Sequence, residues 1–275
     1  MRTARTSVVV ALLLAAATAD AAGRHVEVAQ LGNLPVVRVP AGRWKPQYRP
    51  TRTTTELEVA AFWLMERPVT NGEFLAFVSM HPEYRRGAIA SVFADERYLA
   101  HWQSPLVLGP GVRAEQPVTH VSWFAATAFC EAHGLRLPTE AEWELAAAAS
   151  ATRKDGGNDA SFRRLLLDWY TAPRGELPDV PHGEPNVYGA RDLHGVIWEW
   201  VDDFNNSVVI ADSRNQGDTM RNSFCGADAL VAQDTLDYPA FMRAAMRGSL
   251  EAPYTGTLLG FRCAGDGTLH PEKKR

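Results

Sequence analysis

The sequence predicts an α+β domain of low regular secondary structure, in which few helices and short strands are joined by long loops. Helix start signals occur at only three places after the N-terminal segment. Apolar residues alternate with polar ones only over short runs, as is typical of short strands. Long stretches rich in Gly, Pro and charged residues separate these elements. Together these observations indicate an α+β architecture with long loops.

The N-terminal segment has the pattern of a secretory signal peptide. Arg2 and Arg5 precede the apolar run 8–17, which ends at the small-residue triplet Ala19-Asp20-Ala21. This apolar run is shorter than the roughly 20 residues of a membrane-spanning helix, so a cleaved signal over residues 1–21 is favoured over a membrane anchor. No later stretch is long and apolar enough to cross a bilayer. We therefore expect a periplasmic or secreted protein without a membrane span after signal cleavage.

The composition excludes two classes of partner. Lys and Arg number 28 against 32 Asp and Glu, a formal net charge of −4, and the basic residues form no stripe. A mildly acidic chain of this kind has no electrostatic footprint for nucleic acid or anionic lipid. Because 46% of the residues are hydrophobic and eight are Trp, the chain can bury a sizeable core.

The elements follow in order along the chain. Residues 25–63 alternate apolar and polar side chains and contain a Pro-Ala-Gly turn signal, which predicts short strands. A capping box from Thr70 to Glu73 predicts a first helix, and Ser122 starts a second that Gly134 stops. A second capping box, from Thr139 to Glu142, opens a third helix that runs into a series of alanines.

The remaining segments are predicted as loops and two buried strands. Residues 83–115 are irregular and rich in Gly, Pro and aromatics, and we expect them to form a long ordered excursion over the surface. Residues 150–184 are predicted to be a variable connection. Residues 195–201 and 258–263 have the apolar character of buried strands joined by long loops.

Three cysteines, Cys130, Cys225 and Cys263, lie far apart without CxxC or zinc-ligand spacing. In an oxidising compartment two of them can pair and leave one over. Their spacing alone leaves open which two pair.

Other residue groups give weaker signals. His182 and Glu184 with His194 faintly match a two-histidine-one-carboxylate iron site, but their short spacing within a loop disfavours it. The aromatic loop residues either line a ligand groove or are scattered between core and surface. They are Tyr98, Trp102, Tyr238 and Tyr254. The sequence contains no nucleophile motif, phosphate loop, HExxH or dinucleotide fingerprint.

Five sequence blocks carry a family resemblance. They are RPVTNGEF at 67–74, QPVTHVSW at 116–123, LRLPTEAEWE at 135–144, YGARDLHG at 188–195 followed by WEW at 198–200, and GFRCA at 260–264. In these blocks the chain resembles the formylglycine-generating enzyme (sulfatase-modifying factor) family, which includes ergothioneine-synthase C-terminal domains and a pyoverdine-maturation protein. The resemblance implies a C-type-lectin-like α+β domain over residues 35–266, between an N-terminal lead at 22–34 and a polar tail at 267–275.

Most block residues have a structural interpretation that we favour over a catalytic one. Thr139 and Glu142 cap a helix, and Gly260 allows close backbone packing. His120 fits a family variation and is expected to have a hydrogen-bonded structural role. The block tryptophans are expected in the core. They are Trp143, Trp198 and Trp200.

The resemblance also implies roles for the cysteines. It pairs Cys130 with Cys263 in a disulfide, and places Ala147 and Ala244 where the family has a second one. Cys225 lies near the family's first active-site cysteine, and Ser223 matches a family serine, so these two residues are the catalytic candidates. The alternative for Cys225 is a structural cysteine, either buried or paired with Cys263.

The cofactors expected from the resemblance are copper and calcium. Family enzymes oxidise a substrate cysteine with dioxygen at copper bound by two thiolates, but residues 226–241 contain no second active-site cysteine. Copper is therefore not expected. Structural calcium would be held by oxygen ligands, although Val196 replaces the family's asparagine and the same side chains also fit a hydrogen-bonded scaffold. The candidate ligands are Asn186, Asp192, Glu199 and Asp202.

The function expected from these observations is that of an exported accessory maturation factor, acting on or binding a protein or peptide-derived substrate in the cell envelope. Two alternatives stand beside it. One is a true formylglycine-generating oxidase that activates sulfatases. The other is a non-catalytic, lectin-like binding or assembly module.

Overall fold

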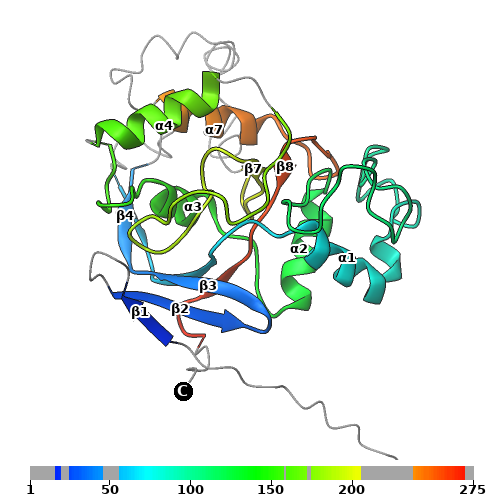
Figure 1. Cartoon of the computed structure of the whole chain (residues 1–275), viewed down its shortest axis with the longest axis horizontal. Helices are drawn as coiled ribbons and strands as arrows, with labels where there is room; N and C mark the ends of the chain where they lie inside the picture. Colours follow the sequence, from blue (N-terminus) through cyan, green and yellow to red (C-terminus); the bar gives the residue numbers. More distant parts are fainter. Residues whose placement is uncertain are drawn as a thin grey trace, which may run out of the picture.

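The computed structural model of the chain describes residues 16–19, 25–45, 56–157, 159–171, 175–205 and 238–269. These residues form short strands and helices joined by long loops, which confirms the predicted α+β class. In Figure 1 the main sheet lies at one end of the molecule, α4 and α7 lie at the other, and α1 and α2 lie at one side. No helix in the described ranges is long and apolar enough to span a bilayer.

The main sheet has five antiparallel strands in the order β1-β2-β3-β6-β9. They are β1 (Ala16–Ala19), β2 (His25–Leu31), β3 (Leu34–Val39), β6 (Phe62–Met65) and β9 (Ala264–Asp266). All four residues of β6 are buried, and β3 and β9 flank this strand on its two sides. β1 lies within the predicted signal peptide, and its Ala16 pairs with Val28 of β2.

Two smaller sheets contain two strands each. β4 (Gly42–Trp44) pairs antiparallel with β5 (Leu57–Val59), and β7 (Trp198–Glu199) pairs parallel with β8 (Leu259–Gly260). The strands predicted at 195–201 and 258–263 were therefore too long. The first segment begins at Gly195, whose φ of +95° is not that of a strand. In the second segment the carbonyls of Phe261 and Cys263 accept from Val69 and Met65, so the pairing with β7 does not continue.

The three predicted helices are confirmed. They are α1 (Asn71–Met80), α2 (Trp123–Ala132) and α3 (Glu140–Ala147), and a short 3-10 helix, η1 (Pro82–Tyr84), follows α1. Thr70 and Thr139 each cap a helix in a complete capping box. Ser122 accepts from the amide of Ala125 at the start of α2. Each cap stabilises its helix by about 1 kcal/mol.

Two further helices were not predicted. α4 (Ala160–Thr171) lies in the segment interpreted as a variable connection, and α7 (Tyr238–Gly248) lies in a stretch interpreted as loop. Asp159 starts α4 by accepting the amides of Ser161 and Phe162.

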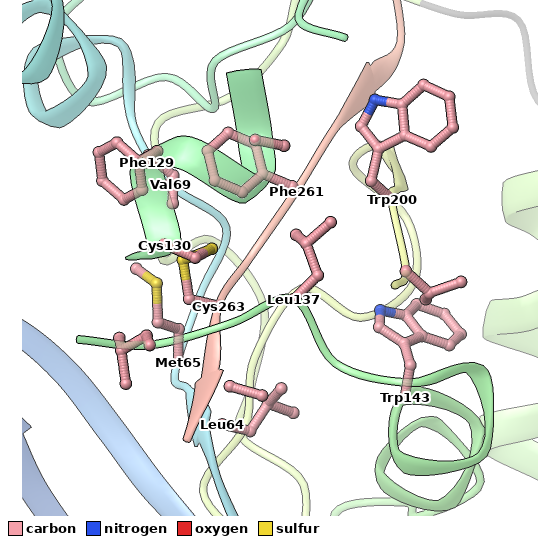
Figure 2. Packing of buried hydrophobic residues seen from close by; sticks show 14 of the residues in the cluster. Leu64, Met65, Val69, Phe129, Cys130, Leu137, Trp143, Trp200, Phe261 and Cys263 are labelled. Atoms are coloured by element: carbon pink, nitrogen blue, oxygen red, sulfur yellow. A yellow bond between two sulfur atoms is a disulfide. The ribbon is translucent and has the colours of Figure 1, made fainter. Parts of the chain in front are cut away.

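The core contains most of the block residues (Figure 2). Trp143 and Trp200 lie on one side of the segment that leads into β9, and Phe129 lies on the other. Trp198 is only partly buried, and its ring packs on Trp169. A Cβ at Gly260 would lie 2.2 Å from the carbonyl oxygen of Val118, which confirms its close-packing role.

The prediction that residues 83–115 form an excursion over the surface needs correction. Tyr98 and Trp102 are 3% and 2% exposed, and both pack in the core. Their polar atoms are satisfied, since Tyr98 Oη donates to the carbonyl of Tyr84 and Trp102 Nε1 donates to Asn71 Oδ1. The segment therefore buries its own aromatic anchors.

Candidate functional site

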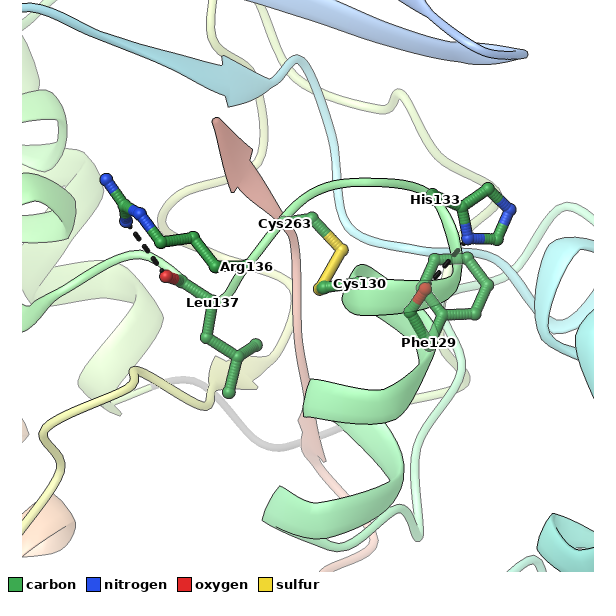
Figure 3. The surroundings of a disulfide bond; sticks show 6 residues. All are labelled: Phe129, Cys130, His133, Arg136, Leu137 and Cys263. Atoms are coloured by element: carbon green, nitrogen blue, oxygen red, sulfur yellow. Dashed lines mark hydrogen bonds between the residues drawn. A yellow bond between two sulfur atoms is a disulfide. The ribbon is translucent and has the colours of Figure 1, made fainter. Parts of the chain in front are cut away.

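The predicted disulfide is present. Cys130, near the end of α2, is bonded to Cys263, directly before β9, and both residues are fully buried (Figure 3). Neither sulfur is therefore available as a thiolate in this structure. Of the three cysteines in the sequence, only Cys225 remains, and it lies outside the described residues together with Ser223.

The positions of the second family disulfide hold two buried alanines, Ala147 on α3 and Ala244 on α7. Ion pairs join these helices. Glu144 of α3 lies 2.7 Å from Arg243 and 2.7 Å from Arg247, and all three side chains are nearly inaccessible to solvent. Burial raises the pKa of Glu144, but the two guanidinium groups outweigh it and hold the pKa at about 2. Glu144 is therefore a carboxylate at neutral pH.

Glu199 and Asn186 are committed to protein contacts. The carboxylate of Glu199 accepts from Nε and Nη2 of Arg262 at 2.7 and 2.8 Å and from Trp143 Nε1 at 2.8 Å. Asn186 Oδ1 accepts the amides of Tyr188 and Ala190, and its Nδ2 donates to a backbone carbonyl. These side chains hold the segments around them in place.

The other two calcium candidates differ from each other. Asp192 has φ +58° and accepts the amides of His182 and Gly183 at 2.9 and 2.7 Å. Asp202 is exposed. Partial desolvation by the surrounding chain and the negative charge of neighbouring Asp203 raise the pKa of the Asp202 carboxyl group. No group of three or more His, Cys, Asp or Glu side chains suited to a metal ion occurs within the described ranges. Asn186, Asp192 and Glu199 therefore act in a hydrogen-bonded scaffold here, and structural calcium stays a prediction.

The histidine-carboxylate group forms no iron site among these same residues. His182 and Glu184 are exposed. His194 instead lies between Trp143 and Phe162, with ring centroids 5.8 and 5.7 Å away. Its Nε2 contacts the carbonyl oxygen of Ala147 at 2.8 Å. Burial and the charge of Arg243 lower the pKa of His194 to about 3.

Because a carbonyl only accepts, the contact of His194 with Ala147 requires the proton on Nε2. Nδ1 of His194 therefore has a lone pair. This atom is buried without a hydrogen-bond partner within the described part of the chain. His194 is thus a neutral side chain with one unused acceptor.

The predicted aromatic residues form no common groove. Tyr98 and Trp102 are core residues, Tyr254 lies under the guanidinium of Arg97, and nothing is described for the side chain of Tyr238. A separate hollow of about 190 Å³ has aromatic walls from residues that the sequence did not single out. They are Tyr84, Phe93, Trp123 and Phe124.

His120 has φ +55°, and its ring stacks on that of His101 with centroids 4.8 Å apart. Nδ1 of His120 and both ring nitrogens of His101 are buried without a hydrogen-bond partner in the described residues. A hydrogen bond with the backbone of Arg97 acts on the His120 ring, in line with the predicted structural role, and packing on His101 also positions the ring.

A cavity of about 310 Å³ is the clearest candidate binding site among the described residues. It lies where the end of α3 and the loop after it face α4 and the segment 183–194. Its buried part includes Ala147, Ala190 and Leu193, and its exposed part includes Leu165 and Glu184. A cavity of this size is at the lower end of the range for small-ligand sites. The sequence did not predict it, because its walls come from three separate segments, one of them the unpredicted helix α4.

Comparison with known proteins identifies the family. A sequence profile described as the sulfatase-modifying factor enzyme 1-like domain matches residues 26–267. "Inactive C-alpha-formylglycine-generating enzyme 2" from Bos taurus is 32% identical over 228 residues, covering 65% of this chain and 74% of the relative. "Formylglycine-generating enzyme" from Streptomyces coelicolor is 33% identical over 188 residues, covering 62% of this chain and 60% of the relative.

Two other similarities are partial or distant. "Serine/threonine-protein kinase pkn1" from Chlamydia pneumoniae is 34% identical over 150 residues, which are 52% of this chain but only 23% of the kinase. The chain thus spans less than two thirds of the kinase and of the Streptomyces enzyme. The solved structure of PvdO from Pseudomonas aeruginosa aligns with a TM-score of 0.48 and 18% identity, covering 85% of this chain and 94% of that one. On the profile match over nearly its whole length and on the bovine relative, the chain belongs to the formylglycine-generating enzyme, or sulfatase-modifying factor, family.

Proposed function

We propose that this chain is an exported accessory maturation factor of the sulfatase-modifying factor family, which acts on or binds a protein or peptide-derived substrate in the cell envelope. Export is supported by the basic, apolar and small-residue order of residues 1–21. A protein or peptide substrate is supported by family membership, since relatives carry the name of an enzyme that generates formylglycine.

The cysteine count is the observation that carries the proposal. The disulfide between Cys130 and Cys263 leaves Cys225 as the one remaining cysteine of the sequence. One thiolate is not the pair of soft ligands that copper-dependent oxidation in this family uses. The count therefore supports a factor that works without a copper-dithiolate centre.

The relatives are consistent with this choice. The bovine relative bears the name of an inactive enzyme, and the chain covers 74% of its length. The Streptomyces relative bears the name of an active one, and the chain covers 60% of it. Membership of this family therefore does not by itself imply oxidase activity.

A thiol and aldehyde experiment tests the proposal. Titration of the unreduced, denatured chain with a thiol reagent should find one thiol, and Cys225→Ser should find none. The native chain, supplied with copper(I), dioxygen and a cysteine-containing peptide, should form no more peptide aldehyde than copper alone. Cys225-dependent aldehyde formation would overturn the proposal in favour of the sulfatase-activating oxidase.

Export and maturation need their own measurement. Mass spectrometry of the chain recovered from the producing cell's envelope should show the loss of 21 or 22 N-terminal residues. The envelope proteins of cells with and without the gene should then differ in covalent mass for at least one partner. Retention of Met1, or identical masses throughout, would contradict export or maturation respectively, and the second result would favour the non-catalytic binding module.

A further inference from the structure

We infer that the cavity beside His194 binds an alkyl chain ending in a protonated amine, as in a lysine side chain. The inference deepens the proposed function and rests on it only for the peptide origin of that amine. Three properties of the cavity support it: an apolar body, an excess of acidic groups and one carboxylate without a partner.

The apolar body comes from both ends of the cavity. Ala147 and Ala190 are each 2% exposed and lie at its buried end. At the open end Leu165 of α4 is 51% exposed, although it lines the cavity. An alkyl chain that enters here would cover Leu165 and remove apolar surface from water, which is favourable in proportion to the area covered.

The charged groups on the walls are all acidic. Asp159, Glu184 and Asp192 line the cavity, and no Lys or Arg belongs to its described lining. Hydrogen bonds from the side chain of Ser161 and the amide of Phe162 lower the pKa of Asp159 to about 2, so this group is ionised at neutral pH. His194 adds no positive charge, because burial keeps it neutral. The cavity therefore complements a cation and disfavours an anion.

The unused hydrogen-bonding capacity of the cavity is that of one carboxylate. Asp159 caps α4 and Asp192 accepts two backbone amides, so both are largely committed. Glu184 lines the cavity, is exposed, and has no hydrogen-bond or ion-pair partner within the described part of the chain. Nδ1 of His194 also lacks a partner there, but this atom is inaccessible and does not face the cavity. A ligand that brings N–H donors satisfies the carboxylate of Glu184, and an ammonium group brings three donors.

A titration with matched probes tests the site. The purified chain is titrated with Nα-acetyl-lysine N-methylamide and followed by the methyl NMR signals of Ala190, Leu193 and Leu165. The norleucine analogue keeps the alkyl chain and lacks the ammonium group, and the Nε-acetyl-lysine analogue keeps the length without the charge. The lysine probe should give saturable shifts at these methyls and bind more tightly than either analogue.

Paired variants locate the effect. Glu184→Gln should weaken binding of the lysine probe about twofold to fivefold, as expected for loss of one exposed charge contact. Glu251→Gln removes an exposed carboxylate that does not line the cavity and should leave binding unchanged. Leu165→Ser should weaken binding, whereas Leu167→Ser, on the same helix and 50% exposed but not in the lining, should not. These positions are exposed, so circular dichroism should show folded variants.

The outcomes separate the alternatives. Equal binding of the lysine and norleucine probes, an absence of shifts with both the lysine probe and n-pentylammonium, or equal effects of the two leucine variants would overturn the inference. Binding of n-pentylammonium without binding of the lysine probe would keep the alkylammonium site and assign it to a free amine. The thiol and aldehyde measurements do not involve this cavity, so a failed titration leaves the maturation proposal standing, and the reverse also holds.

Discussion

His101 and His120 are stacked in the folded chain with three ring nitrogens lacking a hydrogen-bond partner in the described residues. Burial lowers the pKa of His101 to about 4, and the charges of His120 and Arg86 add to this effect. Burial also lowers the pKa of His120. Both rings are therefore neutral in the folded chain at neutral pH.

Acidification should destabilise the fold through His101, because an unfolded histidine binds its proton near pH 6.5 and the folded one only near pH 4. The unfolded state then binds more protons between these values, so the free energy of unfolding falls as the pH falls through this window. His101→Phe keeps the ring stack and removes the titration. Urea unfolding at pH 7 and pH 5 should show that the variant loses about 1–2 kcal/mol less than the parent chain. Equal losses would contradict a buried neutral His101.

At the scale of single residues the sequence predicted best where a local rule applies. The cap roles of Thr139 and Glu142 follow from a spacing of three residues, and the structure confirms them. Asp192 shows where local sequence rules no longer predict the role of a residue. Its hydrogen bonds to the amides of His182 and Gly183 depend on a left-handed backbone and a loop ten residues upstream, which no local pattern encodes.

At the scale of elements, buried ion pairs hold α3 and α7 together. Glu144 contacts Arg243 and Arg247, and both guanidinium groups also lie over the ring of Trp143, at 5.4 and 4.6 Å from its centroid. Buried ion pairs are costly to break by removing one partner, because the other charge stays in a low-dielectric environment.

Glu144→Gln should therefore lower the free energy of unfolding by about 3–5 kcal/mol, since it leaves two buried guanidinium groups with one carboxylate fewer. Chemical denaturation measures the loss, and amide hydrogen exchange should accelerate in α7. Glu58→Gln is the control, because its carboxylate is 87% exposed and lies 3.9 Å from Arg43. A loss no larger than that of the control would mean that apolar packing alone holds α7.

The two helices missed by the sequence interpretation show why elements are harder to predict than caps. Residues 160–171 do carry an N-terminal Asp159 and apolar residues at helical spacing, such as Phe162, Leu165 and Trp169. The surrounding charged and Gly-containing stretch obscured this signal. α7 is stabilised by arginines that meet a partner about a hundred positions earlier in the chain, so its sequence alone gives little indication of it.

For the whole molecule, the Cys130–Cys263 disulfide joins positions 133 residues apart. Replacing both cysteines by alanine should lower the free energy of unfolding by about 2–5 kcal/mol, because the unfolded chain loses its cross-link. Denaturant unfolding with and without reductant checks this: reductant should destabilise the parent chain to the level of the double variant and leave the variant unchanged. Equal stability of all four samples would show that packing, and not the bond, holds the end of α2 to the segment before β9.

The family and the α+β class were predictable at this scale because five specific blocks identify them. The cavity was not, because Ala147, Leu165 and Glu184 approach one another only through the tertiary fold. The resemblance also suggested Glu199 as a calcium ligand. In the structure its carboxylate accepts hydrogen bonds from Arg262.

The place of β9 in the main sheet also sets the order in which the chain is able to fold. Phe62 of β6 pairs with Asp266, so the buried strand β6 gains its second neighbour only from the last part of the described chain. A polypeptide that emerges with its N-terminus first must hold this apolar strand unpaired on one side until residues 264–266 arrive. Pairing between strands that are far apart in sequence slows folding. It also prolongs the exposure of an unpaired strand edge that can aggregate. Truncation shortly before residue 264 should therefore damage the N-terminal sheet, far away in sequence from the missing end.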